Sequence, residues 1–271
     1  MYFFSTLETI IETASPQKKY ERFRRFYKAY GAGEAVFETD VVPKHFASPS
    51  YAAFCDVVSP QAVPKRKNPA TPQGQILLLH AVAHIEYSAI DLALDHAYRF
   101  AGLPKAYYDD WLEVADDEFR HFFMIEGLLE QLGSRYGALP VHDALFEAAQ
   151  RTTTLMDRMA VVPRYFEANG LDATPQILKK LETIHGNMLI DEIVATLKVI
   201  LKEEVDHVRK GDRWFAYACE RAGRPKSVYF EIIDRYYPGG YPRRKFLNVA
   251  ARKEAGFSCG ELNRISDEKV C

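Results

Sequence analysis

Residues 75–102, QILLLHAVAHIEYSAIDLALDHAYRFAG, decide the fold class of this 271-residue chain. Apolar residues recur there every three or four positions, the period of a helix, and the stretch ends at Gly102-Leu103-Pro104, a typical helix stop. Glu86 lies on the apolar stripe, and its neighbours at helical spacing are Leu79, Val82, Ala83, Ile90 and Ala93. The stretch therefore predicts a long core helix with one buried carboxylate, which needs a partner.

The same helical period continues after this stretch. It predicts three more long helices, the second of which is interrupted by Pro163 and should be kinked there. Their approximate ranges are 106–132, 143–170 and 187–223. A short helix is expected between the last two, over 174–186. No segment alternates polar and apolar residues with a period of two, so we expect an all-α, four-helix bundle.

Both ends of the chain add to this bundle. Two short helices are expected between residues 5 and 31, the first opened by the capping box Ser5-x-x-Glu8 and the second by Ser15-Pro16. Prolines recur between residues 38 and 75 and predict an extended arm that wraps the domain. Near the C-terminus, residues 236–265 are expected to form a loop with at most one helix. We therefore expect three parts: N-terminal helices and arm (1–73), bundle (74–223) and a tail that packs on it (224–271).

Composition excludes several classes of protein. The 35 basic and 37 acidic residues give a formal net charge of −2, which argues against general attraction to nucleic acid or membranes. The four cysteines lie far apart, without a Cys-x-x-Cys pair or the density of a disulfide framework. The N-terminus has no basic start typical of a signal peptide, and no stretch of about 18 apolar residues occurs. These features predict a cytoplasmic protein with no membrane partner.

The expected helix at 16–30 combines basic and aromatic residues. Its six cations are Lys18, Lys19, Arg22, Arg24, Arg25 and Lys28, and aromatic residues recur at helical spacing between them. Such a face could bind RNA through phosphate contacts and base stacking. The favoured interpretation is a surface helix that packs its aromatic stripe on the core. RNA binding stays open as the alternative.

Two Glu-x-x-His motifs lie in the middle of predicted long helices. They are Glu118-Phe119-Arg120-His121 and Glu204-Val205-Asp206-His207. Three residues along a helix turn about 300°, so each carboxylate and imidazole project from one face and can bind the same ion. One such motif is expected by chance in a chain of this length. A third, Glu182-x-x-His185, abuts Gly186 at the end of a short helix and is interpreted as a surface or capping feature.

A two-metal carboxylate site also needs one glutamate from each of two other helices. Glu86 and Glu167 lie in the other two long helices, and they precede the motif glutamates by 32 and 37 residues (from 86 to 118 and from 167 to 204). Four carboxylates in a low-dielectric core would repel one another and be driven to protonate. Two divalent cations would cancel their charge, so the six residues predict a di-metal site.

The neighbours of these residues have predicted roles of their own. Asp117 and Glu203, directly before the motif glutamates, are placed to hold the ligand histidines by hydrogen bonds across the bundle. His80 and His84 share a helix face and could bind metal, but a hydrogen-bonded structural pair is favoured. Oxygen and imidazole ligands without thiolate suit iron or manganese, or a mixed pair, and spacing does not select among them.

Six strings together resemble a bacterial ferritin-like family of unknown function. They are LLHAVAHIEYSAIDLALD, DDEFRHF, LGSRYGALPVHD, RMAVVPRYFEANGLDATP, ILKEEVDHV and GDRWF. The family is related in fold to rubrerythrin and to a tRNA-modifying di-iron monooxygenase. The resemblance implies a ferritin-like bundle with a di-iron or di-manganese site, whose expected ligands match Glu86, Glu118, His121, Glu167, Glu204 and His207. One departure is Glu203, which stands where the di-iron monooxygenases have aspartate.

Three functions are consistent with this pattern. The favoured one is a di-metal oxidoreductase that activates O₂ or peroxide and oxidises an unknown small molecule or a tRNA. It would need an electron donor. Whether the protein forms a homodimer is left open by the sequence. The first alternative is a ferroxidase or metal-handling protein without an organic substrate, and the second is a non-enzymatic ferritin-like module. Retention of all six ligands argues against a decayed site, because each is costly to bury without metal.

Overall fold

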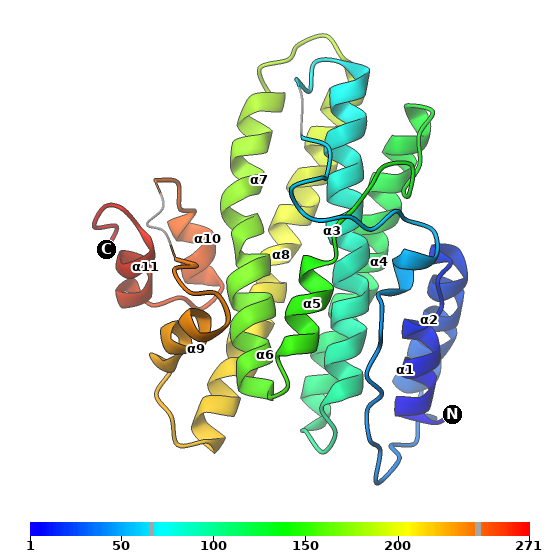
Figure 1. Cartoon of the computed structure of the whole chain (residues 1–271), viewed down its shortest axis with the longest axis vertical. Coiled ribbons are helices and arrows are strands. Elements are labelled where there is room, and N and C mark those ends of the chain that lie inside the picture. Colours follow the sequence, from blue (N-terminus) through cyan, green and yellow to red (C-terminus); the bar gives the residue numbers. More distant parts are fainter. Residues whose placement is uncertain (66–67, 242–244) are drawn as a thin grey trace. The chain divides into compact units, whose positions relative to one another are not determined.

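The computed structural model describes residues 1–65, 68–241 and 245–271. It consists of two compact units, Met1–Gln150 and Arg151–Cys271, which are described separately. In the described residues the regular elements are helices (Figure 1), and extended segments meet in isolated bridges such as Tyr2–Val36 and Val57–Val141. The all-α prediction is therefore confirmed. The division into arm, bundle and tail stays a prediction.

The first unit is built on a hairpin of two long helices, which pack side by side over most of their length. A left-handed Gly102 (φ 73°) makes the turn between them, where a residue without a side chain is needed. The helices of this unit are α1 (Phe3–Ile11), α2 (Pro16–Gly31), η1 (Ser50–Ala53), α3 (Pro72–Arg99), α4 (Lys105–Gln131) and α5 (Ala144–Arg151), whose last residue belongs to the second unit. The predicted helices at 75–102 and 106–132 are confirmed.

Helix α2 packs its aromatic stripe on the core, as the favoured interpretation expected. Phe23 and Phe26 are fully buried, and the Phe23 ring stacks on Phe119 of α4 at 5.0 Å. Ser15 caps the helix by accepting a hydrogen bond from the Lys18 N–H. The basic face is smaller than predicted, because Lys19 is not on it: its side chain is fully buried.

The start of α1 corrects one prediction. The Ser5 hydroxyl does not cap the helix but donates to the Glu38 carboxylate at 2.7 Å, and Tyr2 is the N-cap residue. Glu38 also accepts the Phe4 and Ser5 N–H groups at 2.9 and 2.8 Å, so a residue 33 positions away caps this helix. Tertiary contact has replaced the local capping box.

The described residues of the arm before α3 are extended, as predicted, except for η1. The arm is held to the first unit at several points, for example where the Lys44 N–H donates to the Tyr98 hydroxyl of α3 at 2.8 Å. Tyr51 in η1 is 1% exposed, and its ring contacts the rings of His84 and Tyr87 on α3. Buried aromatic residues therefore make the arm part of the unit.

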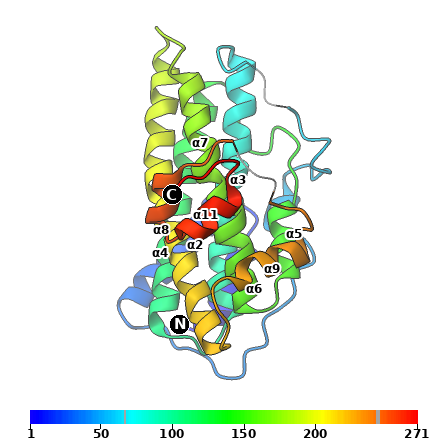
Figure 2. The same ribbon diagram turned by 90° about the vertical axis from the view of Figure 1, so that its left-hand side faces the viewer.

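The described residues of the second unit form one long hairpin and three short helices. Figure 2 shows α7 and α8 side by side, with α9 and α11 in the same unit. Its elements are α6 (Leu155–Val161), the π-helical turn η2 (Val162–Glu167), α7 (Ala168–Leu181), α8 (Met188–Arg221), α9 (Val228–Tyr236), α10 (Val249–Glu254) and α11 (Cys259–Ile265). The helix predicted at 187–223 is confirmed as α8.

Two predictions about the second unit were wrong. The helix expected over 143–170 is broken at residues 152–154, between α5 and α6. It also does not end at residue 170: it continues through Asn169-Gly170 as α7, with Pro163 in a π-helical turn. The expected helix at 174–186 is therefore the end of α7. Residues 236–265, expected to hold at most one helix, contain both α10 and α11, which are too short for a clear helical period.

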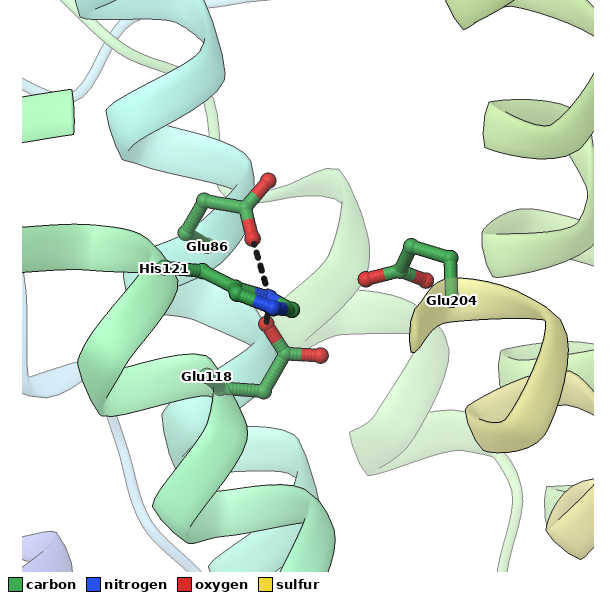
Figure 3. Close-up of side chains that lie close together, drawn as sticks. All are labelled: Glu86, Glu118, His121 and Glu204. Carbon is green, nitrogen blue, oxygen red and sulfur yellow. Dashed lines mark ion pairs between the residues drawn. The ribbon is translucent and has the colours of Figure 1, made fainter. Parts of the chain in front are cut away.

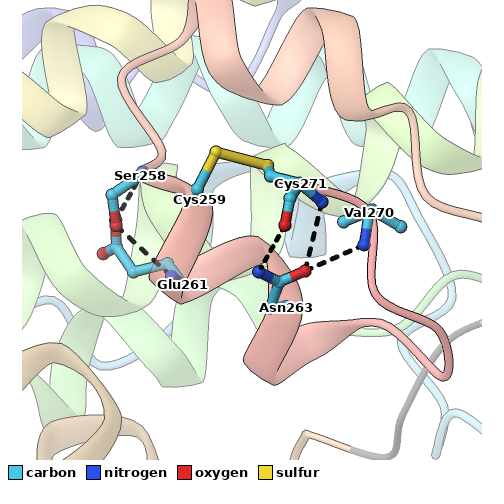
Figure 4. Close-up of a disulfide and its surroundings, with 6 residues drawn as sticks. All are labelled: Ser258, Cys259, Glu261, Asn263, Val270 and Cys271. Atoms are coloured by element: carbon cyan, nitrogen blue, oxygen red, sulfur yellow. Dashed lines mark hydrogen bonds between the residues drawn. A yellow bond between two sulfur atoms is a disulfide. The ribbon is translucent and has the colours of Figure 1, made fainter.

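The tail also contains a disulfide that the sequence did not indicate. Cys259 at the start of α11 is bonded to Cys271, with their Cα atoms 5.5 Å apart (Figure 4). The Asn263 side chain supports the loop between them by accepting the Val270 N–H at 2.8 Å. Cys55 and Cys219 are unbonded and buried.

One helix in the described part of the chain, α3, is long and apolar enough to cross a membrane. Most of its apolar window is buried inside the structure, as expected for a core helix of a globular protein. Its composition is therefore explained by packing, and the cytoplasmic location stays a prediction.

Candidate metal centre

Three of the predicted ligands converge in the first unit. Glu86 comes from α3, and Glu118 and His121 come from one face of α4 (Figure 3). The Nδ1 atom of His121 lies 3.3 Å from a Glu86 carboxylate oxygen and 3.5 Å from a Glu118 oxygen. One ligand atom of each residue lies within 4.8 Å of the others. Figure 3 also draws Glu204, which belongs to the second unit.

All three residues of this cluster are withdrawn from solvent. Glu86 is 5%, Glu118 2% and His121 0% exposed. Burial by itself lowers the pKa of His121, but hydrogen bonds and charge attraction from Glu118 and Glu86 outweigh it and raise the pKa to about 11. Without a metal ion, the imidazole therefore carries a proton that partly balances the two carboxylates.

The donor set fits a metal ion. Two carboxylates and one imidazole nitrogen face a common point, and a divalent cation there would replace the His121 proton and neutralise both carboxylates. Oxygen and nitrogen donors suit several divalent metals, including iron, manganese and zinc. The cluster could hold a metal ion, and its donors do not identify which.

The second unit brings together the other Glu-x-x-His pair. Glu204 and His207 lie on one face of α8, and the His207 Nδ1 atom is 3.5 Å from a Glu204 oxygen. His207 is fully buried, and the Glu204 side chain is 16% exposed. The pair thus repeats the Glu118 and His121 arrangement, with a less buried carboxylate.

The last residue of the π-helical turn η2 is Glu167, the remaining predicted ligand. Pro163, one turn before it, packs so closely on α8 that a Cβ atom at Gly211 would lie 2.3 Å from the Pro163 Cβ. The chain runs in opposite directions in η2 and in α8. Glu167 comes four residues after Pro163, and His207 comes four residues before Gly211. The two side chains therefore start from similar levels along the helix pair. Gly211 was missed from sequence, although a glycine in the middle of a long helix signals close packing.

The predicted supporting residues are half-buried in their units. The Asp117 carboxylate accepts a hydrogen bond from Arg120 at 2.7 Å. Glu203 lies beside Glu204 on α8. Their role in holding the ligand histidines stays a prediction. The third motif is on the surface as interpreted, since Glu182 and His185 are exposed and Glu182 forms an ion pair with Lys198 at 2.7 Å.

His80 and His84 form structural hydrogen bonds, as the favoured interpretation expected. His80 Nε2 accepts the N–H groups of Gly137 and Leu139 at 3.0 and 3.2 Å. His84 lies between the Tyr136 hydroxyl, 2.9 Å away, and the His142 carbonyl oxygen, 2.6 Å away. Both histidines thus attach the segment after α4 to α3.

Comparison with known proteins shows the family to which the chain belongs and names no function for it. A family described as "Protein of unknown function (DUF455)" matches residues 12–263, so the chain belongs to that family. The chain is 34% identical to an uncharacterised protein of Haemophilus influenzae, over 97% of this chain and 93% of the other. No solved structure matches the chain.

Proposed function

We propose that this member of the DUF455 family is a di-metal carboxylate oxidoreductase that activates O₂ or peroxide. The observation that carries the proposal is the buried cluster of Glu86, Glu118 and His121, a donor set with excess negative charge at the centre of a helix pair. Such a cluster is costly to bury without a cation.

The internal repeat extends the proposal from one ion to two. In the first unit, α3 supplies Glu86 and α4 supplies Glu118 with His121; in the second, η2 supplies Glu167 and α8 supplies Glu204 with His207. Each pair of neighbouring segments thus offers a lone glutamate and a Glu-x-x-His motif, the donor set of ferritin-like di-iron bundles. We infer that the two sets face one another in a ferritin-like four-helix bundle around two iron ions, two manganese ions or one of each.

In this mechanism the chain's own residues would bind the ions, balance their charge and exclude water from the site. Glu86 and Glu118 would hold one ion with carboxylate oxygens, and His121 would hold it through Nδ1 in place of its proton. Glu204, His207 and Glu167 would hold the second ion with the same kinds of atoms. Burial of both histidines keeps bulk water away, which strengthens the electrostatic interactions of the site. When bound, the ions would supply the capacity to bind and reduce O₂ or peroxide.

Metal analysis tests the proposal. Protein expressed with added iron or manganese should contain about two ions per chain, and Glu118→Ala and His207→Ala should each lose at least one. The double variant Glu182→Ala/His185→Ala is the matched control, because it removes an exposed Glu-x-x-His motif, and it should retain both ions. Trace metal in the wild type, or equal metal in all variants, would overturn the proposal.

We infer that the substrate is a small organic molecule or a tRNA, which is oxidised with the help of an external electron donor. The tRNA variant rests on α2, where Lys18, Arg22, Arg25 and Lys28 are exposed on one face. Lys19 is buried and Arg24 is paired with Asp116 at 3.0 Å, so these two cations contribute less to that face.

Ferroxidase or metal-handling activity is the alternative, because both activities would use the same ligands. Repeated oxidation of Fe²⁺ by O₂, with many ions consumed per chain, would favour it. Oxidation of no more than the two bound ions would favour the oxidoreductase.

A further inference from the structure

One cavity of the first unit lies away from the metal cluster. Its volume is about 540 Å³, and it is enclosed by the end of α1, arm residues 44–53, α3 and α5. This volume is in the range of pockets that hold small molecules. The geometry points to a second ligand site here, for an uncharged amphipathic molecule with a hydroxyl head and an apolar body.

The cavity and the metal cluster use opposite faces of α3. The α3 residues that line the cavity are Ser88, Asp91, Leu92 and Asp95. At about 100° per residue, they lie about 140–240° around the helix from Glu86. A ligand in the cavity is therefore separated from Glu86 by the width of α3, and its binding does not depend on the proposed metal chemistry.

Asp91 provides the polar anchor in the cavity wall. Its carboxylate forms an ion pair with Lys19 and accepts the Ser50 hydroxyl at 2.6 Å. Lys19 is fully buried and also donates to the Ile11 carbonyl oxygen at 3.1 Å and to Ser50 at 2.8 Å. These contacts hold Asp91 in place, and its side chain remains 14% exposed. A carboxylate has about four acceptor positions, so Asp91 can accept one more hydrogen bond from a ligand.

The charges of the lining select against an anionic ligand. Three carboxylates line the cavity, and each already has one cation: Asp91 has Lys19, Asp95 has Arg99 at 2.6 Å, and Glu12 has Lys44. The lining is thus balanced without a ligand. A ligand carboxylate would be placed among three others, whereas a hydroxyl would donate to Asp91 without adding charge.

The remaining walls are mostly apolar. They include Ile11, Phe46, Leu92, Phe146 and Ala149. An apolar chain or ring against these groups would lose contact with water, which contributes about 25 cal/mol for each Å² buried. The cavity thus combines a mostly apolar surface with a fixed carboxylate acceptor at Asp91, which is the arrangement that orients an amphipathic alcohol.

Titration with three eight-carbon probes tests the inference. Octan-1-ol, octanoate and octylammonium are added to the ¹⁵N-labelled full chain, and backbone amide shifts are followed by NMR. Saturable shifts with octan-1-ol are expected at residues 44–53, 88–95 and 146–150. Octanoate should bind at least tenfold more weakly than octan-1-ol. Equal or tighter binding of octanoate, or shifts spread over the whole chain, would overturn the inference.

A filled cavity provides the variant test. Ala52 is exposed and lines the cavity, so Ala52→Trp should occupy it without disturbing the core and should weaken octan-1-ol binding at least tenfold. Ala106→Trp, at an exposed position of α4 outside the cavity lining, should bind like the wild type. Unchanged binding by Ala52→Trp contradicts the site. Tighter binding of octylammonium than of octan-1-ol would also overturn it, because the ligand would then be a cation.

Discussion

The helix pair α3 and α4 of the first unit and the pair η2 and α8 of the second supply equivalent ligands but hold them differently. The first pair is built from regular helices, and its two carboxylates are at most 5% exposed. The second contains a proline in a π-helical turn, a tight glycine contact and a glutamate whose side chain is 16% exposed. π-Helical turns are frequent at functional sites, where they change the direction of a side chain. The comparison indicates that the second ligand set depends more strongly on backbone irregularity than the first.

Gly211→Ala should break the second pair most severely. The added Cβ would collide with Pro163, and we expect a loss of about 2–3 kcal/mol in the free energy of unfolding. Gly127→Ala in α4 is the matched control, because no heavy atom lies within 4 Å of its Cβ position. The free energy of unfolding of that variant should rise by about 0.5–1 kcal/mol, because alanine has a higher helix propensity than glycine. Urea unfolding measures both, and equal effects would show that close packing at Gly211 is unimportant.

Acid should loosen the first unit before the second. Burial lowers the pKa of His80 and of His84 to about 4. The unfolded chain then binds more protons between pH 6.5 and 4, so stability is complete above about pH 6.5 and is lost as the pH falls towards 4. For His84 the loss at pH 5 is about 2 kcal/mol.

Hydrogen exchange at pH 7 and pH 5 measures this difference unit by unit. Protection should fall in segment 133–143, which His80 and His84 attach to α3. Protection in α8 should change less, because its buried histidine is His207 alone. A uniform loss of protection in both units would contradict the prediction.

Asp117→Asn should weaken metal binding by about tenfold, if Asp117 holds a ligand histidine. Asp116→Asn is the control, since Asp116 pairs with Arg24 on the surface and should leave metal affinity unchanged. Competition with a chelator gives both affinities. Glu203→Gln, the corresponding change in the second unit, shows whether the two ligand sets are supported alike.

The smallest structural effect is expected from the exposed face of α2. The triple variant Lys18→Ala/Arg25→Ala/Lys28→Ala should change the free energy of unfolding by less than about 0.5 kcal/mol, because these side chains are exposed. If a tRNA is the substrate, the same variant should bind it more weakly and with a smaller dependence on salt. Unaltered tRNA binding would argue against a tRNA substrate, and a small organic molecule would then be the remaining substrate class.

Long regular helices were predicted well because their signals are local. The apolar period around Glu86 and the Glu-x-x-His spacing located α3, α4 and α8 and placed Glu118 beside His121. The third long helix was predicted poorly, because Asn169-Gly170 usually ends a helix and because its helical period did not reveal the break between α5 and α6. Packing against Gly211 stabilises a π-helical turn at Pro163.

The sequence by itself determined the helical class and the residue types that could hold metal, since periodicity and i, i+3 spacing are properties of a single helix. Only tertiary structure decided that Glu86 reaches His121, that Glu38 caps α1, and that Lys19 is buried against Asp91. The Cys259–Cys271 disulfide likewise depends on how α11 and the last residues fold back. Each of these contacts joins residues distant in the chain, and local propensity contains no information about such contacts.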